Sequence, residues 1–545
     1  MTLSFDVVAA AAGSALGVSW RPRPPAPEVR ADVDQVRAAF VATAARLTEL
    51  ADAARADGAD EPADILAAQA LMAGDATFVE DVVRRMGGGA APTSVLVREV
   101  AERHAAVLDS LDSDVLRGRA ADVRQIGRMV VDELAGTRRV APDGAFVLVD
   151  EEVTAPDLLE HADRLVGAVS VRGGVNSHAA IVARSLGVPL VVQAPSPVLD
   201  VADGTLLLVD ADVRRLVVSP DQDAQAEARA VAADRAAEAA ADRELQALPA
   251  ETVDGTLVTL LANVASGVEA RRGVEAGCDG FGLVRTELAF LTARAWPTRT
   301  DHEGQLAAVL APAGALPVTV RLLDFTNDKK PPFADAPSLG LAGLLEHPWA
   351  LDAQLTALVA VGSDVDLRVL VPMVTGPGQV RAVRERLAYA AGQLGAVPPP
   401  VGAMVETPEA VAAAPAVAAE SDFLSIGTND LTAAVLGLER TDPSFATAMT
   451  LHPTVLGGVE ATVRAAAAAG VPMSVCGDAA ADPQVLPVLI GAGVRSVSVS
   501  PSRLAAVRRL VRAVRLSDCV EQFERARTAE SSAPTASPVR LGHAS

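Results

Sequence analysis

The stretch GGVNSHAAIVARSLGVP, residues 173–189, decides how the first half of this chain folds. It follows an apolar run over residues 165–171, which predicts a buried strand. The two glycines allow a tight turn that a residue with a Cβ would resist. Asn176 or Ser177 can then cap a helix over residues 178–186, which a glycine and a proline end. The stretch therefore predicts a strand, a tight loop and a short helix.

His178 stands in the first turn of that helix. A helix N-terminus carries partial positive charge and free N–H groups, so it suits a phosphoryl group. A histidine in this place can accept the phosphoryl group covalently. On local spacing alone, an ordinary surface histidine is an equally good interpretation.

Composition limits the classes of protein to consider. The 545 residues predict three or four domains, and the 50% hydrophobic content suffices for large cores. A net charge of −22 argues against nucleic acid and anionic membranes as partners. It would favour a basic protein partner or serve solubility alone. No apolar run is long enough to predict membrane insertion. Three cysteines without CxxC spacing argue against a zinc or disulfide framework and favour the reducing cytoplasm.

The first half predicts an α/β domain with a helical insertion. Residues 1–29 and 138–220 are expected to form one α/β domain, with a strand pair in residues 1–20. Residues 30–137 contain helical patterns and no strand-like run, which predicts an inserted helical bundle. Residues 221–250 read as an exposed linker helix.

The second half alternates apolar runs with helix-length segments. Eight such runs over residues 251–516 predict a (β/α)8 barrel, in which chemistry lies at the carboxyl ends of the strands. Residues 517–545 are expected to hold a terminal helix end and a disordered tail. The predicted strands are Val258–Val264, Gly280–Arg285, Val318–Phe325, Leu367–Val374, Val401–Glu406, Phe423–Gly427, Met473–Cys476 and Val497–Ser500.

Polar residues gather at the ends of these strands. Glu406 and Asp430 are hard oxygen ligands that suit Mg²⁺. Cys476 could protonate a carbanion, although a lone cysteine is more often a small buried hydrophobe. Arginines can grip a small substrate with a phosphate and a carboxylate, and surface salt bridges are the alternative for each. The arginines are Arg285, Arg321 and Arg440.

Longer motifs turn these observations into a family resemblance. Residues 173–189 resemble the phosphohistidine motif of phosphoenolpyruvate-utilising enzymes, with His178 on the active histidine. The resemblance implies that residues 1–29 and 138–220 are the swivelling phosphohistidine domain of such enzymes. The segments GFGLVRTE, VTVRLLDF, VPMV, AMVETPEA, DFLSIGTNDL, GLER and SVCGD resemble the strand-end motifs of the phosphoenolpyruvate-binding barrel. RGRAADVRQIGR, residues 117–128, resembles the end of the helical subdomain in enzyme I of the bacterial phosphoenolpyruvate:sugar phosphotransferase system. Related dikinases and synthases carry an ATP-binding domain, for which this chain has no room.

The resemblance implies a reaction and its partners. Phosphoenolpyruvate and Mg²⁺ would bind at the barrel mouth, His178 would take the phosphoryl group, and Cys476 would protonate enolpyruvate. The helical insertion, residues 30–137, would dock the small phosphocarrier HPr, and the barrels would form a homodimer. The implied substrate and metal residues are Arg285, Arg321, Glu406, Asn429, Asp430 and Arg440.

Several positions depart from the family pattern. The usual D-x-GGDK loop lacks its two glycines in residues 324–329, and the arginine of LG-x-R is replaced by Ala342. A second arginine position holds Leu345, and CGE has become CGD at Asp478. Around Gln69, the acidic and histidine character usual in carrier-docking helices is absent.

The chain's only two lysines offer a replacement for the lost arginine. Lys329 and Lys330 follow the third barrel strand and could contact the phosphate, although a chance surface pair is equally compatible. An active enzyme I is the favoured interpretation. A phosphotransferase with another carrier comes second, and an attenuated regulatory homologue comes third.

Overall fold

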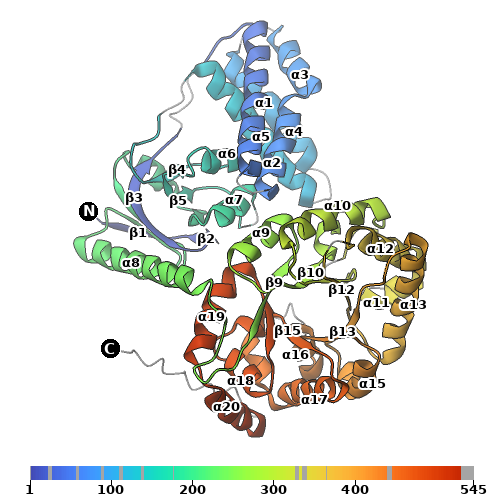
Figure 1. Cartoon of the computed structure of the whole chain (residues 1–545). Coiled ribbons are helices and arrows are strands. Elements are labelled where there is room, and N and C mark those ends of the chain that lie inside the picture. The colour runs from blue at the N-terminus through green and yellow to red at the C-terminus, as the bar shows by residue number, and fades with distance from the viewer. Residues whose placement is uncertain are drawn as a thin grey trace. The chain divides into compact units, whose positions relative to one another are not determined.

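Two compact units divide the chain, Met1–Glu238 and Ala239–Ser545 (Figure 1). The structure is a computed structural model. It describes residues 2–22, 28–56, 60–87, 91–109, 114–136, 140–175, 177–291, 293–325, 330–333, 340–363, 365–438 and 445–529.

An eight-stranded mixed sheet forms the base of the first unit, in the order β1-β8-β7-β3-β4-β5-β6-β2. β3 to β6 run parallel, whereas the other pairs are antiparallel. Its strands are β1 (Leu3–Asp6), β2 (Val8–Ala11), β3 (Ser14–Trp20), β4 (Phe146–Asp150), β5 (Leu165–Ser170), β6 (Leu190–Val192), β7 (Leu206–Asp210) and β8 (Arg215–Val218).

The predicted strand pair in residues 1–20 is wrong. Three strands occupy this segment, and none pairs with another of the three. β1 pairs with β8, β2 with β6, and β3 lies between β7 and β4. Gly17 lies inside β3 and does not break it. Its lack of a side chain makes room for Val166, because a Cβ at this position would lie 2.8 Å from a Val166 methyl group.

A bundle of five helices is inserted between β3 and β4, as the absence of strand patterns predicts. Its apolar positions form a core of their own, which includes Phe40, Leu66 and Ile126. The sequence did not reveal the short α3 as a separate helix. Asp75 caps it, and the Asp75 side chain accepts a hydrogen bond from the backbone N–H of Thr77. The helices are α1 (Val33–Ala56), α2 (Asp60–Ala73), α3 (Ala76–Met86), α4 (Thr93–Asp109) and α5 (Asp114–Ala135).

Three further helices follow in the chain. α6 (Ala155–Leu159) and α7 (His178–Leu186) pack on the sheet core through residues such as Leu158 and Val182. α8 (Gln222–Leu245) is the predicted linker helix. The exact domain boundaries stay a prediction.

The second unit contains a closed parallel barrel of eight strands, which confirms the predicted fold class. The strands are β9 (Thr259–Val264), β10 (Phe281–Arg285), β11 (Val318–Arg321), β12 (Leu367–Val371), β13 (Val401–Val405), β14 (Leu424–Gly427), β15 (Met473–Cys476) and β16 (Ser496–Val499). All eight lie within the predicted segments to within one residue at their starts. β11 ends four residues earlier than predicted.

Helices alternate with the barrel strands (Figure 1). They are α9 (Gly267–Glu275), α10 (Arg299–Leu310), α11 (Gly340–Glu346), α12 (Pro348–Val361), α13 (Pro377–Leu394), α14 (Pro408–Ala412), α15 (Ala414–Ala419), α16 (Thr428–Leu436), α17 (Pro453–Ala469), α18 (Leu486–Gly491), α19 (Leu504–Ala513) and α20 (Leu516–Thr528). α20 buries Cys519 and Phe523 in the barrel core. The rest of the predicted tail, residues 530–545, lies outside the described residues. Within the described ranges, no helix has both the length and the apolar character of a membrane span.

Candidate active site

The loop before α7 has the geometry that its glycines and cap predict. Gly173 has a φ of +105°, a conformation that favours glycine. Ser177 is the cap, and its Oγ accepts a hydrogen bond from a first-turn backbone N–H at 3.3 Å. The alternative cap, Asn176, lies outside the described residues. Arg184 closes the loop by donating from Nη1 to the carbonyl of Val175 at 3.0 Å.

His178 makes a specific contact with the helical insertion. Its Nδ1 lies 2.8 Å from Oδ1 of Asp122 on α5, and Asp122 is 2% exposed. Because an ionised carboxylate only accepts hydrogen bonds, we assign the ring proton to Nδ1. Nε2 then carries the lone pair, and no other residue in the described ranges hydrogen-bonds to this ring. Nε2 is therefore the ring nitrogen that keeps an available lone pair.

A buried glutamine holds Asp122 in place. Gln69 on α2 donates from Nε2 to Oδ1 of Asp122 at 2.7 Å, and Arg119 donates to Oδ2 at 3.3 Å. The Gln69 side chain is fully buried, so its contact is with Asp122 and not with a partner protein. One signal of this network was present in the sequence, because Asp122 lies within the family segment 117–128.

In the second unit, the carboxyl ends of the barrel strands surround a cavity of about 100 Å³. Six residues predicted from sequence line it: Arg285, Arg321, Glu406, Asn429, Asp430 and Cys476. Lys330 is exposed and is not among the lining residues. Lys329 and Arg440 lie outside the described residues. Lining residues that the sequence did not single out include Asn263, Leu283, Met404 and Thr428.

Arg321 is a buried cation at the end of β11. Its Nη2 donates to the Glu287 carboxylate at 2.7 Å, and its Nη1 lies 2.9 Å from the Asp324 carboxylate. Burial alone would lower the pKa of Arg321, but the carboxylates of Asp324, Glu287 and Glu406 raise it above the usual value. Its Nε is buried and has no hydrogen-bond partner among the described residues. A permanently charged arginine with a spare donor therefore faces the cavity.

A second layer of polar residues fixes the end of β11. Thr286 donates from its hydroxyl to the carbonyl of Arg321 at 2.9 Å, and Gln354 donates to that hydroxyl at 3.1 Å. Gln354 also accepts from the Leu323 backbone at 3.0 Å. The sequence signal that could have revealed Gln354 was its place as the one polar residue on the otherwise apolar buried face of α12.

Glu406 lies at the end of β13 and is 1% exposed. Burial, followed by the charges of Asp324 and Asp430, raises the pKa of Glu406 to about 8. One carboxylate oxygen accepts the backbone N–H of Met373 at 2.7 Å. The other lies beside Gly427, where a Cβ would approach it to 2.5 Å. Glycine at 427 therefore leaves room for this carboxyl group.

The donor set at the cavity fits a hard divalent cation. Glu406 and Asp430 lie close enough that the charge of Asp430 raises the pKa of Glu406, and a divalent ion would neutralise this repulsion. No group of three histidine, cysteine or acidic residues that could hold a metal occurs in the described part of the chain. Two carboxylates completed by substrate and water oxygens form a typical Mg²⁺ site.

Cys476 lies at the end of β15 and is buried. Burial raises the pKa of the Cys476 thiol to about 11, and the nearby charge of Glu406 adds to this effect. Its Sγ donates to the carbonyl of Ile426 at 3.5 Å and lies 3.7 Å from the hydroxyl of Ser425. The thiol therefore keeps its proton at neutral pH.

The loops after β14 and β15 are joined by a reciprocal pair. Asn429 donates to the carboxylate of Asp478 at 3.0 Å, and the Asp478 backbone N–H donates to Asn429 Oδ1 at 3.1 Å. The shorter acidic side chain at this family position thus still reaches Asn429. At the other departures, Ala342 is exposed on α11 and Leu345 packs against the barrel core.

Comparisons with known proteins agree with this architecture. Residues 239–516 match the PEP-binding domain of PEP-utilising enzymes, residues 142–213 their mobile domain, and residues 8–119 their N-terminal domain.

Similar proteins span most of this chain. A phosphoenolpyruvate-protein phosphotransferase of Streptomyces coelicolor is 34% identical over 525 residues, which cover 93% of this chain and 91% of the relative. One of Cupriavidus necator is 32% identical and covers 88% and 87%. A multiphosphoryl transfer protein of Rhodobacter capsulatus is 35% identical and covers 74% of this chain. This chain spans about half the length of that relative, 51%. By these matches, the chain belongs to the family of PEP-utilising enzymes.

Proposed function

We propose that this chain is a phosphoenolpyruvate-protein phosphotransferase of the enzyme I type. It would transfer the phosphoryl group of phosphoenolpyruvate to His178 and then to a histidine of a small carrier similar to HPr, the first step of a sugar phosphotransferase system. The observation that carries the proposal is the convergence of six predicted residues, from the ends of β10, β11, β13, β14 and β15, around one cavity.

The barrel residues would bind and orient the substrate. Arg321 and Arg285 each have a buried Nε without a partner among the described residues, and these donors suit phosphate and carboxylate oxygens. Glu406 and Asp430 would hold Mg²⁺, which supplies neutralisation of phosphate charge when bound. Lys330 and Lys329 are proposed as additional phosphate contacts.

The transfer reaction balances with groups of this chain. The Nε2 lone pair of His178 forms the new N–P bond while the bond from phosphorus to the enol oxygen breaks, and that oxygen keeps the electron pair. The Nδ1 proton stays on the ring, facing Asp122. Cys476 then gives its proton to the methylene carbon of enolpyruvate, which becomes pyruvate, and water restores the thiol proton. The carrier's histidine takes the phosphoryl group by the same type of displacement.

The partners remain part of the proposal. The exposed faces of the helical insertion would dock the carrier, and the net charge of −22 would attract a basic one. A homodimer through the barrel and a cytoplasmic location are proposed from the family resemblance. A phosphotransferase with another carrier is the second candidate, because Gln69 is buried and the acidic character of the docking helices is absent. An attenuated regulatory homologue is favoured by Ala342 and Leu345, where the family carries arginines.

A labelling experiment tests the proposal. With phosphoenolpyruvate labelled at phosphorus and Mg²⁺, the purified chain should acquire acid-labile, base-stable label. His178→Gln should abolish the label. His104→Gln is the matched control, because His104 is also paired with an aspartate in the first unit, Asp81 at 2.8 Å, and its label should equal that of the parent. Label on the His178 variant would overturn the assignment, and absence of label on the folded parent would support the regulatory candidate.

A further inference from the structure

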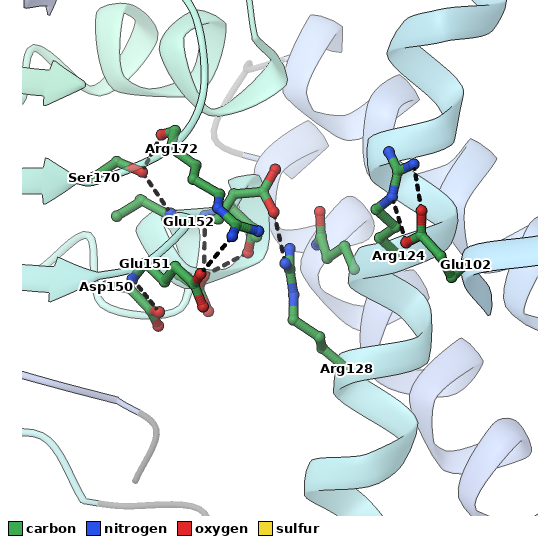
Figure 2. A network of polar contacts seen from close by, with 12 residues as sticks. Glu102, Arg124, Arg128, Asp150, Glu151, Glu152, Ser170 and Arg172 are labelled. Carbon is green, nitrogen blue, oxygen red and sulfur yellow. Dashed lines mark hydrogen bonds and ion pairs between the residues drawn. The ribbon is translucent and has the colours of Figure 1, made fainter. Parts of the chain in front are cut away.

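A second, larger cavity lies within the first unit, and neither His178 nor Asp122 is among its lining residues. It measures about 600 Å³ and is walled by α4, α5 and the loops that follow β4 and β5 (Figure 2). Its charged lining residues are Arg98, Glu102, Arg124, Arg128, Glu152 and Arg172. The proposed reaction uses none of them.

The lining is basic in a strongly acidic chain. Four arginines and two glutamates give the lining a formal charge of +2, whereas the whole chain carries −22. Glu102 binds Arg124 through two hydrogen bonds of 2.8 and 2.9 Å. Glu152 accepts one from Arg128 at 2.6 Å. Arg172 lies 3.0 Å from Glu151, which is not itself a lining residue. Four arginines against three glutamates leave an excess charge of +1 at the cavity.

Arg128 has donors left over after this pairing. Its Nη1 is bonded to Glu152, but its Nε and Nη2 are buried and have no hydrogen-bond partner among the described residues. Buried donors without acceptors are unfavourable, so an oxygen-rich ligand would stabilise this side chain. Figure 2 shows Arg128 reaching from α5 toward Glu152, with Arg172 on the neighbouring loop.

Small residues leave the space open. A Cβ at Gly127 would lie 2.5 Å from the Cβ of Ala101, so α4 and α5 are in close contact there. Ala101 itself lines the cavity and leaves space beside the longer arginine side chains. The volume lies within the range of small-molecule sites and exceeds what a free phosphate ion needs.

We propose that this cavity binds a small molecule through a phosphate group. A phosphate monoester carries a charge of about −1.5 to −2 at neutral pH and offers three acceptor oxygens, which suit the positive charge of the cavity and the two donors of Arg128 that lack a partner in the described ranges. A single carboxylate supplies only two oxygens. The ligand would contact two elements that hold His178: α5, which carries Asp122, and the loop at Arg172, which continues into Gly173. Occupancy should therefore change the rate of His178 phosphorylation.

Calorimetric titration of the full chain without Mg²⁺ tests the site, with inorganic phosphate and glycerol 3-phosphate as probes and succinate as a dicarboxylate control at constant ionic strength. Arg128→Gln should weaken phosphate binding roughly tenfold or more, because it removes charge-assisted hydrogen bonds. Glu152→Gln should tighten binding, an effect that misfolding would not produce. Arg84→Gln, on α3 and 73% exposed, is the matched control and should bind like the parent.

The outcomes separate the possible ligands and sites. Tighter binding of glycerol 3-phosphate identifies a phosphate monoester as the ligand, and tighter binding of inorganic phosphate identifies the free ion; either supports the site. Equal affinity in the parent and in Arg128→Gln would overturn it, as would succinate binding as tightly as phosphate. Loss of binding in Arg285→Gln alone would assign the phosphate to the barrel cavity. None of these results depends on phosphoryl transfer to His178, so this inference can fail while the proposed function stands.

Discussion

Asp122→Asn should slow phosphorylation of His178 without unfolding the chain. The two side chains have nearly the same size. In the parent, His178 Nδ1 and Gln69 Nε2 lie 2.8 and 2.7 Å from Asp122 Oδ1, and the asparagine oxygen can still accept both hydrogen bonds. The negative charge is lost. Because the ring becomes more positive as Nε2 bonds to phosphorus, Asp122 should stabilise the transition state more than the ground state.

The magnitude follows from the burial of Asp122. A hydrogen bond to a charged group contributes about 1.5–3 kcal/mol and one between neutral groups about 0.5–1.5 kcal/mol, so the charge itself accounts for about 1–1.5 kcal/mol. Asp122 is 2% exposed, so solvent screens its charge little. Loss of this difference in the transition state corresponds to a rate roughly 5- to 13-fold lower. Removal of the carboxylate's contacts altogether, in Asp122→Ala, should cost more, because the Gln69 amide would lose its acceptor.

Rapid-quench labelling with phosphoenolpyruvate, in single turnover, measures this rate directly. Asp81→Asn is the matched control, since Asp81 makes a 2.8 Å contact with His104 in the same unit but has no part in the proposed reaction. Circular dichroism melting checks that both variants are folded. A labelling rate for Asp122→Asn within twofold of the parent would refute the role of Asp122 in orienting and charging His178.

Three further predictions concern the second unit. The pKa of Glu406 is raised to about 8, so Mg²⁺ binding must displace a proton from this carboxyl group. The apparent Mg²⁺ affinity in the labelling assay should therefore rise from pH 6.5 to 8.5. Glu406→Gln should bind Mg²⁺ more weakly and lose this pH dependence. If a lysine replaces the family arginine, Lys330→Ala should lower the labelling rate and Ala342→Arg should add little; a strong gain in Ala342→Arg with no loss in Lys330→Ala would show an attenuated enzyme. Burial lowers the pKa of His302 to about 4, below its unfolded value of about 6.5. The unfolded state then binds more protons than the folded state between these two pH values. The contribution of His302 to the free energy of unfolding should be complete above pH 6.5 and fall by roughly 3 kcal/mol as the pH drops through 4. Urea unfolding of His302→Met should lack this pH dependence.

Local signals in the sequence predicted the elements that carry the site. The helix over residues 178–186 has the predicted bounds, because its serine cap and terminal glycine act on their immediate neighbours. The barrel strands were recognisable as apolar runs at regular spacing. Since parallel strands in a barrel bring their carboxyl ends together, Arg285, Glu406 and Cys476 could be expected around one cavity before any coordinates were known.

Contacts between distant segments could not be read in the same way. Asp122 and His178 are separated by 56 residues, and nothing in the pattern of α5 distinguishes Asp122 from a solvent-facing acid. The pairing of the first three strands depends on partners about 130 to 215 residues away, so a local hairpin was the simpler but incorrect interpretation. The cavity of about 600 Å³ in the first unit was also hidden, because its arginines come from two helices and a loop that meet only in the folded unit.

The strand order of the first unit has a consequence for how the chain folds as it is synthesised. β1, β2 and β3 are made before their partners, which lie in residues 146–218. The five helices between them mostly contact one another and can form early, whereas the sheet has high contact order and must wait for β8. The nascent amino-terminal strands therefore stay unpaired while more than a hundred residues emerge behind them. We expect this interval to be the period in which the protein depends most on chaperones that shield exposed strand edges.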